Sequence, residues 1–230
     1  MTKSVTEREL VLGILLEVTR DGEYSHVALR NVLNKYQYLD KKERAFITRV
    51  TEGTLEHMIE LDYIINQFSK VKVNKMKPVI RNLIRSAVYQ LKYMDSVPNS
   101  AACNEAVKLA TKKGFSNLKG FVNGVLRNIE RNLETITYPE ETNEIEYLHV
   151  KYSMPKWILE QWLPKYGRET VETMLADFQT EKPTTIRCNL NQMSKEQLIE
   201  ELKTEGVQVQ EHPYLPYALM ISGYDYLADL

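Results

Sequence analysis

The spacing of hydrophobic residues changes along the chain, and this change predicts two structurally different parts. In residues 1–137, apolar side chains recur every three or four positions, which is typical of helices with one buried face. No segment of this part alternates between apolar and polar residues as a strand does. We therefore expect an all-helical domain, with helices beginning near Thr6, Ser25, Asp40, Leu61, Pro78, Pro98 and Ser116.

Polar residues at the expected helix starts support these boundaries. Thr6 with Glu9, and Asp40 with Glu43, have the spacing of a capping box, in which two residues exchange side-chain-to-backbone hydrogen bonds. Ser25 is expected to cap the second helix with its hydroxyl. These local signals predict well-defined starts for the first three helices.

Residues 144–230 begin with helices and continue with a mixed pattern. Pro155 is expected to start a helix that ends near Gly167, and another helix is expected at about 169–178. The elements expected next are a strand at 184–190, a helix capped by Ser194 and Gln197, and strands at 207–209 and 218–221. The chain is therefore predicted to be mainly α, an all-helical bundle followed by a small, incomplete α+β domain.

Charge divides the chain at nearly the same place as the hydrophobic pattern. Residues 1–134 contain 22 lysines and arginines and 15 acidic residues, whereas residues 135–230 contain 8 and 16. The polar, proline-containing segment 138–143 lies at this change and is the expected boundary between domains 1–137 and 144–230. The basic first domain is the candidate for binding a polyanion.

Two long stretches of this domain contain basic residues and no acidic residue. There are seven basic residues from Lys70 to Met94, and five from Ala106 to Ile129. Lysine and arginine bind phosphates with release of counterions, so such stretches favour RNA binding. A solvated outer helix face is the alternative, although ordinary surfaces mix both signs of charge. The candidate RNA-binding residues are Lys75, Lys77, Arg81, Arg85, Lys112, Lys113, Lys119 and Arg127.

Aromatic residues offer a second possible contact with RNA, because unpaired bases stack on them. The candidates are Tyr36, Tyr38, Tyr89 and Tyr93, although a half-buried core position is the better interpretation of each one taken singly. Trp157 and Trp162 are interpreted as packing anchors of the helix that follows Pro155.

The sequence contains no recognisable catalytic or metal-binding motif. Its four histidines are scattered, and neither Cys103 nor Cys188 has a partner at metal-ligand spacing, so no metal is expected. Glycine-rich cofactor loops are absent. No apolar run approaches the roughly 18 residues of a membrane span, and so few cysteines suit a reducing compartment. We therefore expect a cytoplasmic protein with no membrane partner.

Several segments of the first domain together resemble the NusB family. They are Thr6–Val18, Asp40–Glu56, Val97–Ala110 and Gly120–Asn128. The last two are the most specific, with Asn-Glu-Ala-Val shortly after a proline and then Phe-Val-Asn-Gly-Val-Leu-Arg. The antitermination factor of this family is a helical protein that binds RNA and a ribosomal protein. The resemblance implies a NusB-like, RNA-binding fold for residues 1–137.

The residues that follow resemble the Sun/RsmB family, in which a NusB-like domain is fused to a 16S rRNA cytosine-C5 methyltransferase. The matching segments are Tyr152–Ile158, Trp162–Gly167, Thr184–Asn191 and Ser194–Gly206. The resemblance implies a parent enzyme that uses S-adenosylmethionine. In that enzyme, a cysteine thiolate would add to cytosine C6 and thereby make C5 nucleophilic.

The chain departs from this family at the catalytic motifs. The family's catalytic cysteines follow proline or threonine, but here Cys103 follows Ala102 and Cys188 follows Arg187. We therefore expect a chain truncated before its catalytic domain, inactive alone, with neither catalytic nor cofactor-binding residues. Its expected partners are 16S rRNA and the missing catalytic domain in cis, and not DNA. The alternative is a NusB-like antitermination factor that binds RNA and a ribosomal protein.

Overall fold

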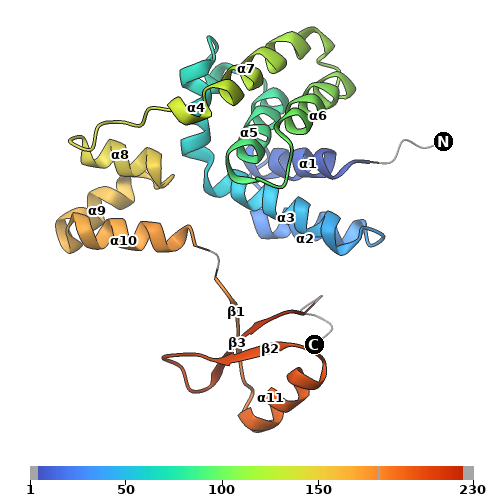
Figure 1. The fold of residues 1–230 in the computed structure, drawn as a ribbon, viewed down its shortest axis with the longest axis vertical. Helices are drawn as coiled ribbons and strands as arrows, with labels where there is room; N and C mark the ends of the chain where they lie inside the picture. The colour runs from blue at the N-terminus through green and yellow to red at the C-terminus, as the bar shows by residue number, and fades with distance from the viewer. Residues whose placement is uncertain (1–4, 181, 225–230) are drawn as a thin grey trace. The chain divides into compact units, whose positions relative to one another are not determined.

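The computed structural model describes residues 5–180 and 182–224, which form two compact units. The units divide between Asp177 and Phe178. The domain boundary expected at 138–143 stays a prediction. Each unit is described by itself (Figure 1).

The first unit is helical in all of its regular elements among the described residues. Seven helices cover its first part: α1 (Glu7–Thr19), α2 (Ser25–Lys35), α3 (Lys41–Glu56), α4 (Met58–Phe68), α5 (Pro78–Tyr93), α6 (Asn99–Lys112) and α7 (Lys119–Arg131). Short 3₁₀ turns lie at Val73–Lys75, Ser116–Leu118 and Leu133–Thr135, so the helix expected to begin near Ser116 begins instead at Lys119. The helices α8 (Glu144–Lys151), α9 (Lys156–Tyr166) and α10 (Arg168–Phe178) follow.

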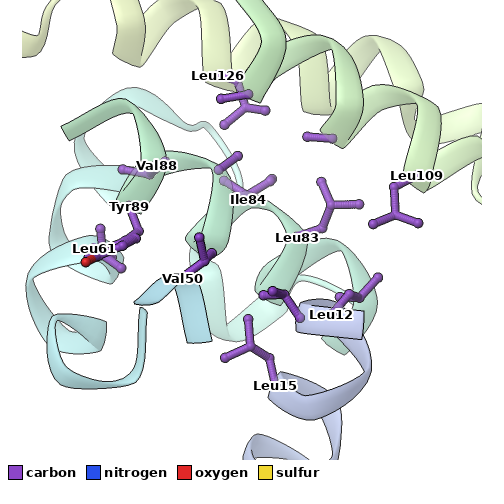
Figure 2. Packing of buried hydrophobic residues seen from close by; sticks show 14 of the residues in the cluster. Leu12, Leu15, Val50, Leu61, Leu83, Ile84, Val88, Tyr89, Leu109 and Leu126 are labelled. Carbon is purple, nitrogen blue, oxygen red and sulfur yellow. The ribbon is translucent and has the colours of Figure 1, made fainter. Parts of the chain in front are cut away.

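Helix α5 lies at the centre of the main hydrophobic core. Its buried residues, including Leu83, Ile84 and Val88, face side chains of α1, α3, α4, α6 and α7 (Figure 2). At Gly53 of α3, an added Cβ would lie 2.1 Å from the Tyr89 ring, so only glycine permits this approach of the two helices. The burial is largely apolar, which provides the main driving force for packing the bundle.

The helix starts confirm some of the local predictions and correct others. Asp40 and Glu43 form the full capping box at the start of α3. Thr6 accepts a bond from the Glu9 amide, but the Glu9 carboxylate binds lysines of α6 and its C-cap rather than the Thr6 backbone. Ser25 is the first residue of α2 and does not cap it: Tyr24 holds the cap position without a side-chain hydrogen bond.

A smaller core joins α8, α9 and α10. Leu148, Leu159 and Val171 are fully buried in it, and Trp162 packs against them. Helix α8 was not predicted from the sequence. The interpretation of Trp157 as a packing anchor is wrong, because this residue is 61% exposed in the first turn of α9, on the face turned away from the core.

The second unit contains a three-stranded antiparallel sheet and one helix. Its elements are β1 (Thr184–Arg187), α11 (Lys195–Thr204), β2 (Gln208–Glu211) and β3 (Ala218–Ser222), with strand order β1-β3-β2. Ile186 pairs with Leu219, and Val209 with Ile221, so one face of the sheet is apolar. These elements confirm a mainly helical chain with a small α+β domain. None of the helices in the described segments is long and apolar enough to span a membrane.

Candidate nucleic-acid interface

The segment between α4 and α5 presents a row of cations on a well-anchored backbone. Val73 and Met76 are buried, and the Asn66 side chain accepts a hydrogen bond from the Val73 amide at 2.9 Å. The Asn128 side chain of α7 donates to the Phe68 carbonyl at 3.1 Å, which fixes the start of the segment. This segment and the first turn of α5 carry five cations, which we call the basic connection: Lys70, Lys72, Lys75, Lys77 and Arg81.

The cations of the basic connection have no acidic partners among the described residues. The four lysines are exposed, and Lys72 makes only a 3.3 Å hydrogen bond to the Asn66 carbonyl. Arg81 forms no ion pair with any described residue, and its Nε is buried without a hydrogen-bond partner. A buried donor without a partner is costly and rare. Five cations within twelve residues, without counter-charges among the described residues, are suited to binding phosphates.

Arg85, four residues after Arg81, is used differently. It forms a bidentate ion pair with Asp62 of α4, at 2.6 and 2.5 Å, and its Nη1 donates to Asn82 at 3.1 Å. The residue is only 7% exposed. Both arginines are predicted RNA-binding residues, but Arg85 is buried in an ion pair and holds α4 against α5. The sequence could not reveal this pair, because Asp62 lies in another helix.

The second group of predicted residues lies around α6 and α7 and is largely neutralised. Lys112 and Lys113 both bind the Glu9 carboxylate, Lys113 at 2.8 Å. Burial raises the pKa of Glu9, but its bonds to these two lysines hold that pKa below its ordinary value. Arg127 pairs with Glu130 at 2.8 Å. The remaining member, Lys119, is exposed and has no ion pair in the described segments.

A buried carboxylate, Glu60, organises charged and aromatic groups at the other end of α5. Glu60 is 2% exposed, and the hydroxyls of Tyr93 and Tyr138 donate to it. Lys92 Nζ lies 3.2 Å and His57 Nδ1 3.3 Å from its oxygens. We call these five residues the Glu60 cluster. It joins α4 and α5 to the chain that follows α7, and no local sequence pattern predicts it.

Burial and contacts act in opposite directions on the Glu60 carboxyl. Burial raises its pKa, but the contacts with His57, Tyr138 and Tyr93, together with the charge of Lys92, more than offset this and hold the pKa of Glu60 below its ordinary value. The carboxylate is therefore ionised and fully partnered. Such a cluster stabilises the fold and leaves nothing available for a ligand.

Three of the four candidate tyrosines pack in or against the main core, and one is exposed. Tyr89 is 6% exposed, and the Tyr93 ring stacks on His57 with ring centroids 4.2 Å apart. Tyr36 is partly buried against the core, whereas Tyr38 is 70% exposed. The core interpretation is therefore right for Tyr36, Tyr89 and Tyr93 and wrong for Tyr38.

The cysteines are placed as core residues rather than as nucleophiles. Cys103 and Cys188 are both buried. Burial, followed by the charge of Glu130, raises the pKa of the Cys103 thiol to about 11, so the thiol stays protonated at neutral pH. In the described segments, no group of three or more histidine, cysteine or acidic side chains could hold a metal ion.

Two family matches account for most of the chain. Residues 5–131 match the NusB family, and residues 154–224 match the ferredoxin-like domain of RsmF/B-like methyltransferases. The first match covers more than half of the chain, and the chain belongs to the NusB family.

Individual relatives extend this similarity. The probable ribosomal RNA small subunit methyltransferase B of Bacillus subtilis is 30% identical over 209 residues, which cover 91% of this chain and 46% of that protein. The transcription antitermination protein NusB of Bacillus velezensis is 31% identical over 134 residues, or 58% of this chain and 99% of that protein. The crystal structure of PH0851 has the same fold over 99% of this chain and 51% of its own, with a TM-score of 0.69 and 20% identity. The chain thus spans about half the length of its methyltransferase relatives.

Proposed function

We propose that this chain binds small-subunit ribosomal RNA and positions it for a methyltransferase catalytic domain. The observation that carries the proposal is the basic connection, where five cations lie within twelve residues of the chain without an acidic partner among the described residues. Phosphate oxygens would supply the missing counter-charge. Lys75, Lys77 and Arg81 are the predicted contacts that the geometry supports best.

The remaining predicted contacts have different roles in this proposal. Lys119 is an additional candidate, because it is exposed and lacks an ion pair in the described part of the chain. Lys112 and Lys113 share one carboxylate, so that the pair keeps one net positive charge and makes a weaker site. Arg85 and Arg127 are occupied by Asp62 and Glu130, and we assign them to the fold.

The proposed reaction of the whole protein is methyl transfer from S-adenosylmethionine to C5 of a cytosine in 16S rRNA. The support is that the methyltransferase relatives align with nearly the whole of this chain, across both family matches. In this proposal the catalytic cysteines and the cofactor site belong to a separate domain. The buried Cys103 and Cys188 take no part, and residues 5–224 bind and orient RNA.

The second candidate function is that of an antitermination factor that binds RNA and a ribosomal protein. The similarity to NusB of Bacillus velezensis favours it, but that similarity is confined to 58% of this chain. The residues beyond it match the ferredoxin-like domain of methyltransferases, which an antitermination factor does not require. We therefore prefer the methyltransferase assignment.

A mobility-shift assay with a small-subunit rRNA stem-loop tests the proposed interface. The variant Lys75→Ala, Lys77→Ala, Arg81→Ala should weaken binding by at least roughly tenfold, because hydrogen bonds between charged groups contribute about 1.5–3 kcal/mol each. The control is Lys165→Ala with Lys203→Ala, which removes two exposed lysines outside the basic connection. Equal affinity of the triple variant and the wild type would place the interface elsewhere.

A further inference from the structure

The turn between α2 and α3 presents an exposed tyrosine on a fixed base. Tyr38 is 70% exposed, and its ring lies edge-on to the ring of Tyr36, at 6.0 Å and 77°. Tyr36 is partly buried and packs against the main core. The bundle therefore holds the Tyr36 ring in place, and the Tyr38 ring contacts the Tyr36 ring while remaining exposed to solvent.

The backbone on either side of Tyr38 is held in place. Leu39 is only 6% exposed, and its amide donates to the Tyr36 carbonyl at 3.2 Å. Asp40 then closes the turn as the cap of α3. With its neighbour Leu39 directed into the core, the Tyr38 side chain is directed outward. An aromatic ring held in this way loses little conformational entropy when a planar ligand stacks on it.

The surroundings of the two rings are positively charged. Residues 30–44 contain five basic and two acidic residues, and both acids belong to the capping box of α3. Lys35 Nζ lies over the Tyr36 ring at 5.7 Å. Arg30 and Lys42 are exposed and have no ion pair among the described residues. An aromatic ring with cations around it matches a nucleotide, whose base stacks and whose phosphates need counter-charges.

We propose that Tyr38, supported by Tyr36, stacks on an unpaired base of the bound RNA. This inference rests on the proposed function and adds a second contact to it. The α2–α3 turn and the α4–α5 connection lie well apart on the bundle (Figure 1). The basic connection would hold phosphates of a stem, and Tyr38 would read an unpaired loop or bulge, with Lys35 and Arg30 near the flanking phosphates. The chain would thereby distinguish a stem-loop from a plain duplex.

Fluorescence anisotropy with two labelled RNAs tests this inference. One is a small-subunit rRNA stem-loop, and the other is a blunt duplex of the same stem sequence. Tyr38→Ala should weaken stem-loop binding by roughly 5-fold to 100-fold, the usual effect of losing one base–aromatic stack. Duplex binding should not change, because a closed duplex offers no base to stack. The salt dependence should also stay the same, because no cation is removed.

Conservative variants separate stacking from other effects. Tyr38→Phe keeps the ring and should bind the stem-loop like the wild type, and Tyr38→Trp should bind at least as well. Unchanged stem-loop affinity of Tyr38→Ala, or an equal loss on both RNAs, would overturn the stacking role. The triple variant of the basic connection should instead lose affinity for both RNAs. If the triple variant binds normally while Tyr38→Ala does not, the proposed interface fails and the stacking contact stands; if the wild type binds neither RNA, both fail.

Discussion

The two ends of helix α5 carry cations in opposite circumstances. Toward the carboxyl end, Arg85 is paired with Asp62 and Lys92 with Glu60, and both acids lie in α4. At the amino end, Lys77 and Arg81 have no acidic partner in the described part of the chain. Burial accounts for Arg85 and Lys77, because a charge removed from water must be paired, whereas an exposed cation is stable alone. Arg81 is the exception, since its Nε is buried without a partner. Unpaired cations are therefore the informative ones for function.

The largest effect should come from removing the buried acid at the paired end. Glu60→Ala leaves Lys92, Tyr93 and Tyr138 without their common acceptor and should lower the free energy of unfolding by about 3–5 kcal/mol. Urea denaturation measures the change. Glu56→Ala, an exposed acid of the neighbouring turn, is the control and should change stability by less than about 0.5 kcal/mol. Equal effects of the two variants would mean that the cluster contributes nothing.

The second largest effect should separate two arginines of one helix. Arg85→Ala leaves Asp62 unpaired and should destabilise the protein by about 2–3 kcal/mol, at the low end for buried pairs because Asp62 is partly exposed. Arg81→Ala removes no ion pair and should change stability by less than about 0.5 kcal/mol while weakening RNA binding. Thermal melts and binding assays on both variants test the contrast. A loss of RNA affinity without a loss of stability in Arg85→Ala would contradict the structural role assigned to Arg85.

The contacts of Glu60 at the carboxyl end of α5 should also affect the pH dependence of stability. Because the pKa of Glu60 is lowered in the folded state, its contribution is fully present above the unfolded-state pKa of a glutamate, about 4.3. The contribution is lost as the pH falls through the lower, folded-state pKa. Glu60→Gln should therefore show a smaller loss of stability than the wild type as the pH is lowered from 5. Parallel curves for the two proteins would contradict the assigned ionisation.

The smallest effect is expected where two lysines share one acid. Glu9→Gln removes the counter-charge of Lys112 and Lys113 and should cost only about 0.5–1 kcal/mol of stability, because the lysines are substantially exposed. It should also strengthen RNA binding slightly at low salt, since two cations lose their internal partner. A fall in RNA affinity on this substitution would contradict the prediction, because it would mean that Lys112 and Lys113 need the Glu9 carboxylate to bind RNA.

Features set by nearby residues could be predicted from the sequence. The capping boxes at Asp40–Glu43 and Ser194–Gln197 are both present, and Gly206 ends α11 with a φ of +85°. The family matches also confirm the family resemblance, which rested on whole segments such as Val97–Ala110. These features need only a few residues adjacent in sequence, so a single chain contains the necessary information.

Features set by distant residues could not be predicted. Glu9 has the right spacing for a capping box, but it binds lysines more than 100 positions away. Arg81 and Arg85 belong to one acid-free stretch, but Arg85 is paired with Asp62 of another helix. The side-chain partners of Glu60 come from three separate parts of the chain. Charge counting along the sequence located the basic region, and only the three-dimensional arrangement divides its cations into paired and unpaired ones.

The salt dependence of RNA binding tests the central claim most directly. Plotting log K against log of the salt concentration gives a slope of roughly −0.7 to −0.9 for each phosphate contact. The variant Lys75→Ala, Lys77→Ala, Arg81→Ala should therefore show a slope smaller in magnitude by roughly 2–3 than that of the wild type. An unchanged slope, whatever the affinity, would contradict phosphate binding by the basic connection.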